Sequence, residues 1–232
     1  MAFHRGPKVV TNGLVLALDA ANTKSYPGSG TTWRDLSGNS RNGTLINGPS
    51  FNNTEGGSIS FDGVDDYVNT NYNAGTFSQF TIHAWIYKTN TTKAFILNAA
   101  GTATPPAIIL GFGIELYETI AYFDAAFGST DAYAEFPFTG NGWNCWSLVY
   151  DGTQTGNSNR LKVYLNAVPK SLTFTGTIAS SIPSSDVFYL SRRPWVVEYS
   201  LCRIANVYMY NRPLSLPEVT QNYNAQKSRF NL

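Results

Sequence analysis

Short runs of alternating apolar and polar residues follow one another along the chain. Runs typical of strands cover residues 13–18, 58–61, 80–87, 146–150, 160–165, 187–190 and 203–210. They are rich in β-branched and aromatic residues, as half-buried strands are. Asn-Gly or Asp-Gly pairs, whose glycines suit the positive φ angles of tight turns, stand at residues 12–13, 42–43, 47–48, 62–63, 141–142 and 151–152. Many short strands joined by tight turns predict an all-β sandwich or barrel.

One helix is predicted near the C-terminus, over residues 216–228. Ser215 is its expected N-cap, and Glu218 three residues later completes a capping box. Leu214 and Val219 have the spacing of a hydrophobic staple around that cap. Four apolar residues then recur at helical spacing, so one face of the helix is expected to dock on the sandwich. These residues are Leu216, Val219, Tyr223 and Phe230.

Composition supports a compact domain and excludes two classes of partner. The 14 Tyr, 14 Phe and 5 Trp supply a large apolar core, whereas charged residues make up only 13% of the chain. The formal net charge is +1, and the densest basic cluster is the pair Arg192–Arg193. Nucleic-acid binding needs several clustered cations, so nucleic acid is not an expected partner. No apolar stretch is long enough to span a membrane, so no membrane partner is expected either.

The N-terminal residues and the cysteines bear on the compartment. The first residues of the chain resemble a signal peptide, because basic residues precede an apolar stretch. Thr11, Asn12 and Gly13 interrupt that stretch. Cys145 and Cys202 are too few for a disulfide framework. Two buried thiols are favoured over one bridge. We expect residues 1–12 to form an N-terminal arm and residues 13–232 a single domain.

Four segments in sequence order resemble the laminin-G-like, concanavalin A-like lectin/glucanase superfamily. They are SISFDGVDDYV at 58–68, FTIHAWIY at 80–87, WSLVYDG at 146–152 with LKVYLN at 161–166, and IANVYMYNRPLS at 204–215. The resemblance implies an all-β fold, a two-sheet antiparallel jelly-roll sandwich with one short C-terminal helix. Two positions depart from the family pattern, because Ala167 and Cys202 stand where glycine is usual.

The opening at 13–22 and 33–38 and the ending at 214–230 are similar to such domains in tailed-phage virion proteins. This similarity implies a non-catalytic virion structural protein that decorates a capsid or tail through protein contacts. Its expected partners are further copies of itself, as a homo-oligomer, and other virion proteins. Such a protein is located in the virion and assembles in the host cytoplasm. The alternative is an adhesin that binds glycans of a host surface.

Catalytic and metal sites receive little support from the sequence. Glycosidases of this fold need two carboxylates that flank the sugar bond. Glu115 and Glu118 are three residues apart, so on a strand they point to opposite faces, and we expect no enzyme. His83 is expected to be a packed structural histidine rather than part of a binding face. No cofactor is expected, although Asp62, Asp65 and Asp66 in one turn could bind calcium. The favoured interpretation is that Asp62 and Asp65 accept hydrogen bonds from backbone N–H groups of their own turn.

Aromatic residues beside arginines are the candidate recognition residues. Aromatic rings stack on sugars, and Tyr, Trp and Arg are also enriched at protein interfaces. A core or interface role is favoured over glycan binding. The candidates are Arg192, Arg193, Trp195 and Tyr199, together with Tyr117 and Tyr122, and Tyr133 as a further tyrosine.

Overall fold

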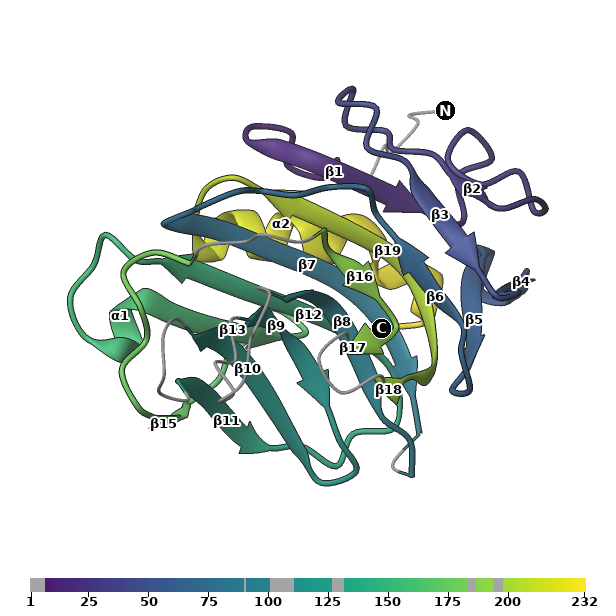
Figure 1. The fold of residues 1–232 in the computed structure, drawn as a ribbon. Helices are drawn as coiled ribbons and strands as arrows, with labels where there is room; N and C mark the ends of the chain where they lie inside the picture. The colour runs from purple at the N-terminus through teal and green to yellow at the C-terminus, as the bar shows by residue number, and fades with distance from the viewer. Residues whose placement is uncertain (1–6, 90, 101–110, 127–131, 183–186, 194–197) are drawn as a thin grey trace.

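Two antiparallel sheets packed face to face make up the domain (Figure 1). The computed structural model of the chain describes residues 7–89, 91–100, 111–126, 132–182, 187–193 and 198–232. Strands dominate these residues, and the longest helix lies near the C-terminus. The structure therefore confirms the predicted sandwich with a short C-terminal helix.

Sheet A contains eight strands among the described residues. In spatial order they are β14 (Val168–Pro169), β13 (Leu161–Leu165), β12 (Gly142–Asp151), β7 (Gln79–Lys88), β19 (Leu201–Tyr210), β5 (Ser58–Asp62) and β4 (Ser50–Asn52), with β1 (Leu14–Asp19) also paired to β19. The strand β19 lies in the middle of the sheet. One edge pairs with β7, and the other pairs first with β5 and then with β1.

Sheet B contains nine strands among the described residues. In spatial order they are β15 (Thr173–Thr175), β11 (Tyr133–Pro137), β10 (Ile120–Ala126), β9 (Gly111–Leu116), β8 (Ala94–Ala100), β16 (Tyr189–Leu190), β6 (Tyr67–Asn69), β3 (Gly43–Ile46) and β2 (Thr32–Trp33). A separate ribbon joins β17 (Arg192–Arg193) to β18 (Glu198–Tyr199). The remaining elements are α1 (Asn157–Arg160), α2 (Leu216–Gln226) and the short 3₁₀ helices η1 (Thr54–Gly56) and η2 (Lys227–Phe230).

The main core fills the space between the two sheets. Alternate residues of each strand point into it, as in Phe80 and Ile82 of β7 and Phe112 and Ile114 of β9. The rings of Phe80 and Phe112 meet edge to face with centroids 5.7 Å apart. Residues between these positions point to the outer face of their sheet. This alternation decides which side chains are left for function.

The helix α2 begins at the predicted cap. The backbone N–H and the hydroxyl of Ser215 both donate to Oε2 of Glu218, and the expected capping box is present. Leu214 and Val219 are both buried in one apolar cluster, which fits the predicted staple. The helix ends at Gln226, and η2 continues the chain to Phe230.

One predicted core position of this helix is wrong. Leu216 is 44% exposed, whereas Val219 and Phe230 are buried and Tyr223 is half-buried. The buried face instead contains Asn222 and Gln226. Polar residues occupy it because the sheet beneath offers polar partners. Asn222 donates to the hydroxyl of Tyr210 at 3.0 Å, and Gln226 donates to that of Tyr208 at 2.7 Å.

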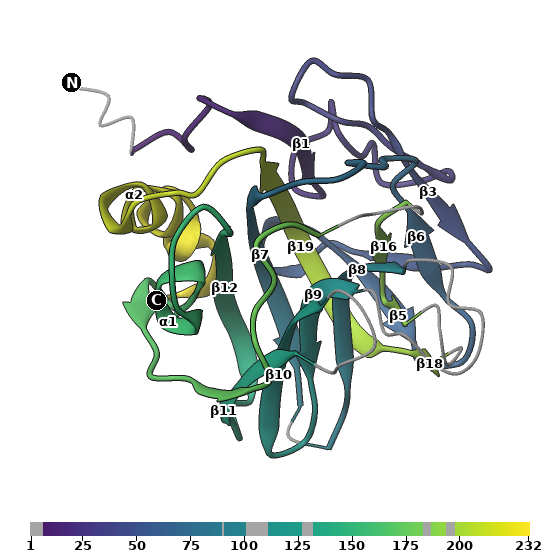
Figure 2. The ribbon, with the colours of Figure 1, turned by 60° about the vertical axis from the view of Figure 1, so that its left-hand side comes forward.

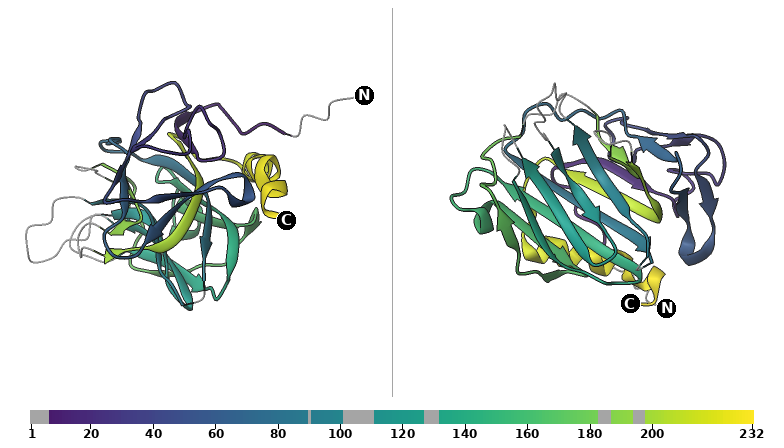
Figure 3. Two further views of the ribbon diagram at one scale, coloured as in Figure 1. Left: turned by 90° about the vertical axis from the view of Figure 1, so that its right-hand side faces the viewer. Right: turned by 60° about the horizontal axis from the view of Figure 1, so that its bottom comes forward.

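The outer face of sheet A is covered by α2 and η2 (Figures 2 and 3). Trp85 of β7 stacks on Phe230 and Tyr223, with ring centroids 4.1 Å and 5.6 Å away. The N-terminal segment also contacts the helix, where the N–H of Val10 donates to Oδ1 of Asn222 at 2.8 Å. The predicted division into an arm and a domain stays a prediction, but residues around Val10 pack against the domain.

His83 and Cys145 lie beneath this helix and are fully buried. Nδ1 of His83 is 2.8 Å from the hydroxyl of Ser147, and its Nε2 is 3.4 Å from the sulfur of Cys145. The expectation of a structural histidine is confirmed. Cys145 and Cys202 are both free and buried, as expected.

Two of the six predicted turn glycines serve another purpose. Gly43 and Gly152 are absent from the positive-φ positions, whereas Gly13, Gly48, Gly63 and Gly142 occupy them. A Cβ atom on Gly152 would lie 2.1 Å from the carbonyl oxygen of Ser180, so this glycine permits a close backbone approach. The strand predicted over residues 187–190 is shorter, since only Tyr189–Leu190 pairs. Among the described residues no helix is long and apolar enough to cross a membrane.

Candidate functional site

The outer face of sheet B carries most of the predicted recognition residues. In β10 the side chains of Ala121 and Phe123 enter the core, so Tyr122 between them points outward. Strand pairing places Tyr122 opposite Glu135 of β11 on one side and opposite Glu115 of β9 on the other. Phe95 of β8 continues the same row. These residues are far apart in the sequence, and they come together only through the pairing of their strands.

An ion-pair network occupies the centre of this face. Nε of Arg193 lies 2.9 Å from Oε1 of Glu115, whose side chain is only 3% exposed. The hydroxyl of Tyr117 donates to the other oxygen of Glu115 at 3.1 Å. Arg193 also lies 3.4 Å from Glu198, which pairs with Lys93 at 3.1 Å. The buried carboxylate is therefore neutralised by the protein itself.

Three tyrosines form a continuous row beside this network. Tyr117 and Tyr122 meet edge to face with centroids 5.5 Å apart, and Tyr122 meets Tyr133 in the same way at 5.5 Å. Burial raises the pKa of Tyr117, and the charge of Glu115 adds to this effect. Burial also raises the pKa of Tyr122, followed by the repulsion from Glu135. The hydroxyls of Tyr117 and Tyr122 therefore stay neutral donors near pH 7.

Arg192 lies at the other end of the face, between aromatic rings. Its guanidinium carbon lies 4.9 Å from the ring centroid of Tyr67 and 5.0 Å from that of Tyr189. Tyr199 adds a third ring, 6.2 Å from Tyr67. Arg192 makes none of the ion pairs found among the described residues. It is held in place by the rings, and no described acidic side chain forms an ion pair with it.

We name this surface the tyrosine–arginine face. It consists of Tyr67, Lys93, Glu115, Tyr117, Tyr122, Tyr133, Glu135, Tyr189, Arg192, Arg193, Glu198 and Tyr199. The predicted residues Arg192, Arg193, Tyr199, Tyr117 and Tyr122 all belong to it. Trp195 lies outside the described residues, so its role stays a prediction. The sequence reasoning missed Tyr67 and Tyr189, although both occupy alternate, outward positions beside the core residues Val68 and Leu190.

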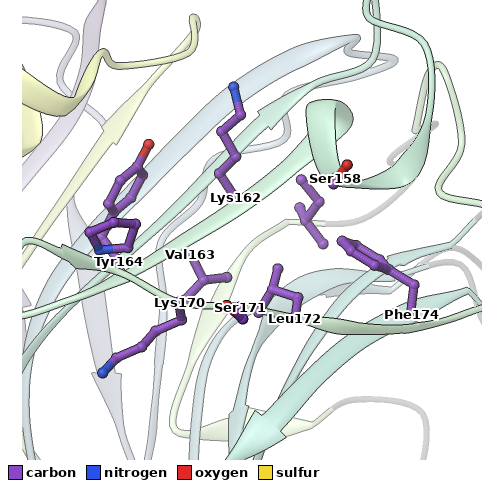
Figure 4. Close-up of a pocket in the computed structure, with 10 residues that line it drawn as sticks. Ser158, Lys162, Val163, Tyr164, Lys170, Ser171, Leu172 and Phe174 are labelled. Carbon is purple, nitrogen blue, oxygen red and sulfur yellow. The ribbon is translucent and has the colours of Figure 1, made fainter.

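Cavities lie elsewhere on the described surface. One of about 330 Å³ opens at the edge of sheet A, between β13 and the segment from Lys170 to Phe174 (Figure 4). Leu161, Val163, Leu172 and Phe174 give it apolar walls. The ammonium groups of Lys162 and Lys170 point away from each other, so they do not converge on one ligand group. A second cavity, of about 420 Å³, lies between Leu201 and Thr89, where the ends of β19 and β7 part.

The acidic turn matches the favoured interpretation in part. Oδ1 of Asp62 accepts the N–H of Val64 at 2.8 Å, and Oδ2 of Asp66 accepts the N–H of Asp62 at 3.1 Å. Asp66, rather than Asp65, is thus the second carboxylate that bonds to the turn. Carboxylate oxygens of all three aspartates lie within 4.8 Å of one another. Burial raises the pKa of Asp66, and its two neighbours add to the rise. The expectation of no cofactor, with calcium at this turn as the alternative, stays a prediction.

The two glutamates considered as a catalytic pair, Glu115 and Glu118, differ in burial and in their partners. Glu115 is buried in β9 and bound by Arg193 and Tyr117, whereas Glu118 is exposed beyond the end of that strand. A retaining or inverting glycosidase needs one free carboxylic acid and one free carboxylate on either side of its substrate. Glu115 and Glu118 do not provide that arrangement.

Replacing Glu115 by Gln is expected to lower stability and to change no hydrolytic activity. The substitution keeps the shape but removes the charge that neutralises Arg193, at a cost of about 2 kcal/mol. Urea unfolding measures the loss, and assays on β-glucans test for hydrolysis. Glu118→Gln is the matched control, and it should leave stability unchanged because Glu118 is exposed. Hydrolysis by the wild type that either variant abolishes would contradict the assignment.

Comparisons with solved structures show the same fold in larger proteins. The binding domain of botulinum neurotoxin serotype G matches with a TM-score of 0.64 and 16% identity, over 93% of this chain and 51% of that one. The binding domain of botulinum neurotoxin DC, solved in complex with rat synaptotagmin II, matches with 0.62 and 14%, over 94% and 52%. A sialidase of Trypanosoma rangeli, in complex with sialic acid, matches with 0.60 and 19%, over 94% and 33%. The chain thus spans about a third to a half of these proteins.

The sequence comparison agrees with the structural one. No curated protein matches the chain. Residues 62–220 match the family Laminin_G_3, described as the concanavalin A-like lectin/glucanases superfamily. That span is well over half of the 232 residues. The protein therefore belongs to the concanavalin A-like lectin/glucanase superfamily.

Proposed function

We propose that this chain is a non-catalytic assembly domain that binds its partner through the tyrosine–arginine face. The observation that carries the proposal is the state of Glu115. This carboxylate lies at the centre of the face but is buried and paired with Arg193, so it serves to organise the surface. Around it stand half-exposed tyrosines and arginines. These residue types dominate the binding energy of protein interfaces.

The proposed setting is the virion of a tailed phage. The similarity of residues 13–22, 33–38 and 214–230 to phage virion domains supports it, as do two free cysteines in place of a disulfide set. The protein would decorate a capsid or tail after assembly in the host cytoplasm. Contacts with other virion proteins and with further copies of itself would hold it there.

A glycan-binding adhesin is the second candidate, and one observation favours it. The tyrosine row places aromatic rings next to the carboxylate of Glu135, and sugars are bound by rings beside groups that hydrogen-bond to hydroxyls. A fold relative was solved with sialic acid, and another with rat synaptotagmin II. Shared fold alone does not choose between these partners.

The proposal predicts that Tyr122→Ala lowers the number of copies on purified particles at least tenfold. Loss of a central interface tyrosine costs about 2 kcal/mol of association. Quantitative mass spectrometry of particles produced with either protein measures the copy number. Val168→Ala is the control, since Val168 is exposed on β14, an edge strand of the other sheet. Absence of the wild type from particles, together with binding to a glycan array, would favour the adhesin instead.

A further inference from the structure

Two charges on the tyrosine–arginine face have no ion-pair partner among the described residues. Arg193, Glu115, Lys93 and Glu198 neutralise one another in the central network. Arg192 and Glu135 take part in none of the ion pairs between described residues. Counted over the described residues, the face thus carries one spare cation and one spare anion.

These two charges lie at opposite ends of the face. Glu135 belongs to β11, near one edge of sheet B, and Arg192 follows β16, which pairs with β8. Four strand spacings separate β11 from β16, or roughly 19 Å at about 4.8 Å per strand. Tyr117, Tyr122 and the neutralised Glu115 lie between them. The face is therefore positive at one end, negative at the other, and aromatic in the middle.

Aromatic rings hold the side chain of Arg192, and strand pairing fixes the backbone of Glu135. The rings of Tyr67 and Tyr189 stand at 67° to each other, and the guanidinium of Arg192 fits the corner between them. Glu135 projects from a strand paired on both sides, with β10 and with β15. A fixed charge loses less conformational entropy when it binds than a freely moving one. Arg192 is thus prepared for an oppositely charged partner, and Glu135 presents its charge from a fixed position on β11.

We propose that the occupant of this face is a second copy of the same chain, packed face to face about a twofold axis. In such a dimer residue i of one copy contacts residue j of the other, and j contacts i. An axis that bisects the line from Arg192 to Glu135 places Arg192 of each copy against the partner's Glu135, twice. The tyrosine row then packs on itself at the centre. This inference rests on the proposed function and names its partner.

The dimensions of the face suit such an interface. A specific interface buries about 800 Å² per partner, a patch roughly 30 Å across. A separation of roughly 19 Å between the two charges fits inside that patch. Tyrosines at its centre and charge pairs at its rim match the usual anatomy of interfaces.

A charge-swap experiment tests the dimer by sedimentation velocity at low ionic strength. Arg192→Glu and Glu135→Arg should each weaken self-association at least about 100-fold, because each sets like charges against one another at two places. An equimolar mixture of the two variants should associate to within about tenfold of the wild type, since both pairs are then complementary again. The double variant should do the same. A misfolded variant could not be rescued in this way.

Three outcomes would overturn the dimer. They are a wild type that stays monomeric at about 100 µM, single variants that associate like the wild type, and a mixture that stays dissociated. The proposed function has a separate test. If the wild type is monomeric in solution but Tyr122→Ala still lowers the copy number on particles, the assembly face stands and its occupant is another virion protein. If the monomer binds an acidic sugar in an Arg192-dependent way, the occupant is a glycan.

Discussion

Removing residues 214–232 should leave a protein that aggregates instead of folding to a stable domain. The deletion takes away α2 and η2, which cover Trp85, Cys145 and Tyr210 on the outer face of sheet A. These side chains are at most 1% exposed in the intact chain. An exposed apolar patch of that kind promotes association. Light scattering and thermal melting of the truncated protein measure the effect, and a soluble product with an unchanged melting temperature would contradict it.

Two point variants provide a matched pair for the same prediction. Val219→Ala should cost about 1–3 kcal/mol, because Val219 is fully buried between the helix and the sheet. Leu216→Ala, one turn earlier, should change stability by less than about 0.5 kcal/mol, since Leu216 is 44% exposed. Urea unfolding of both variants separates the contribution of burial from that of helix propensity. Equal losses would mean that the helix does not dock through Val219.

Acidification from pH 6.5 to pH 5 should destabilise the fold by about 2 kcal/mol through His83 alone. Burial lowers the pKa of His83 to about 3, whereas an exposed histidine titrates near 6.5. Below pH 6.5 His83 is therefore protonated in the unfolded chain but stays neutral in the folded chain. Stability falls by about 1.4 kcal/mol per pH unit across that window and stops falling near pH 3.

No neighbour of His83 titrates in the same range. Cys145 and Ser147 of β12 contact the imidazole, and Tyr208 of β19 stacks on it at 6.2 Å. Burial raises the pKa of Cys145 and of Tyr208, so both stay neutral. Hydrogen bonds from Arg212 lower the pKa of Glu218 to about 2, and that carboxylate affects stability only below about pH 4.5.

His83→Gln is the variant that isolates this effect. Glutamine can still bond to Ser147 but does not titrate. Urea unfolding at several pH values should show a steep loss for the wild type between pH 6.5 and 5, and a much flatter profile for the variant. The comparison uses the change of the unfolding free energy with pH. A loss of stability that is the same at every pH therefore does not affect it. Parallel profiles would show that His83 is not the buried base.

Local features were predictable from the sequence because they depend on neighbouring residues. The cap of α2 follows from Ser215 and Glu218 alone, and the alternation in β7 follows from side chains that point to opposite faces. The exposure of Leu216 was not predictable from periodicity. It depends on Tyr208 and Tyr210, whose hydroxyls draw Gln226 and Asn222 to the buried side of the helix.

The tyrosine–arginine face was only half predictable for a related reason. The sequence marks Arg192, Arg193 and several tyrosines as candidates by residue type. It gives no sign that Arg193 lies against Glu115 or that Arg192 lies against Tyr67, because these residues meet only through the order of strands in sheet B. Strand order depends on the whole topology. For the same reason the spare charge of Glu135 becomes visible only in the folded protein.

The central place of β19 sets the order in which the chain can fold. Of the strands that the structure describes, β19 is synthesised last, yet it pairs with β7 on one edge and with β5 and β1 on the other. The hydrogen bond from the N–H of Val10 likewise forms only after Asn222, 212 residues further along, has been synthesised. Until then the described strands of sheet A form three unjoined parts, which are β14-β13-β12-β7, β5-β4 and β1. Their open edges invite pairing with other chains. Sheet A is thus completed only once β19 has been synthesised, and chaperones that shield strand edges should raise the yield of the protein.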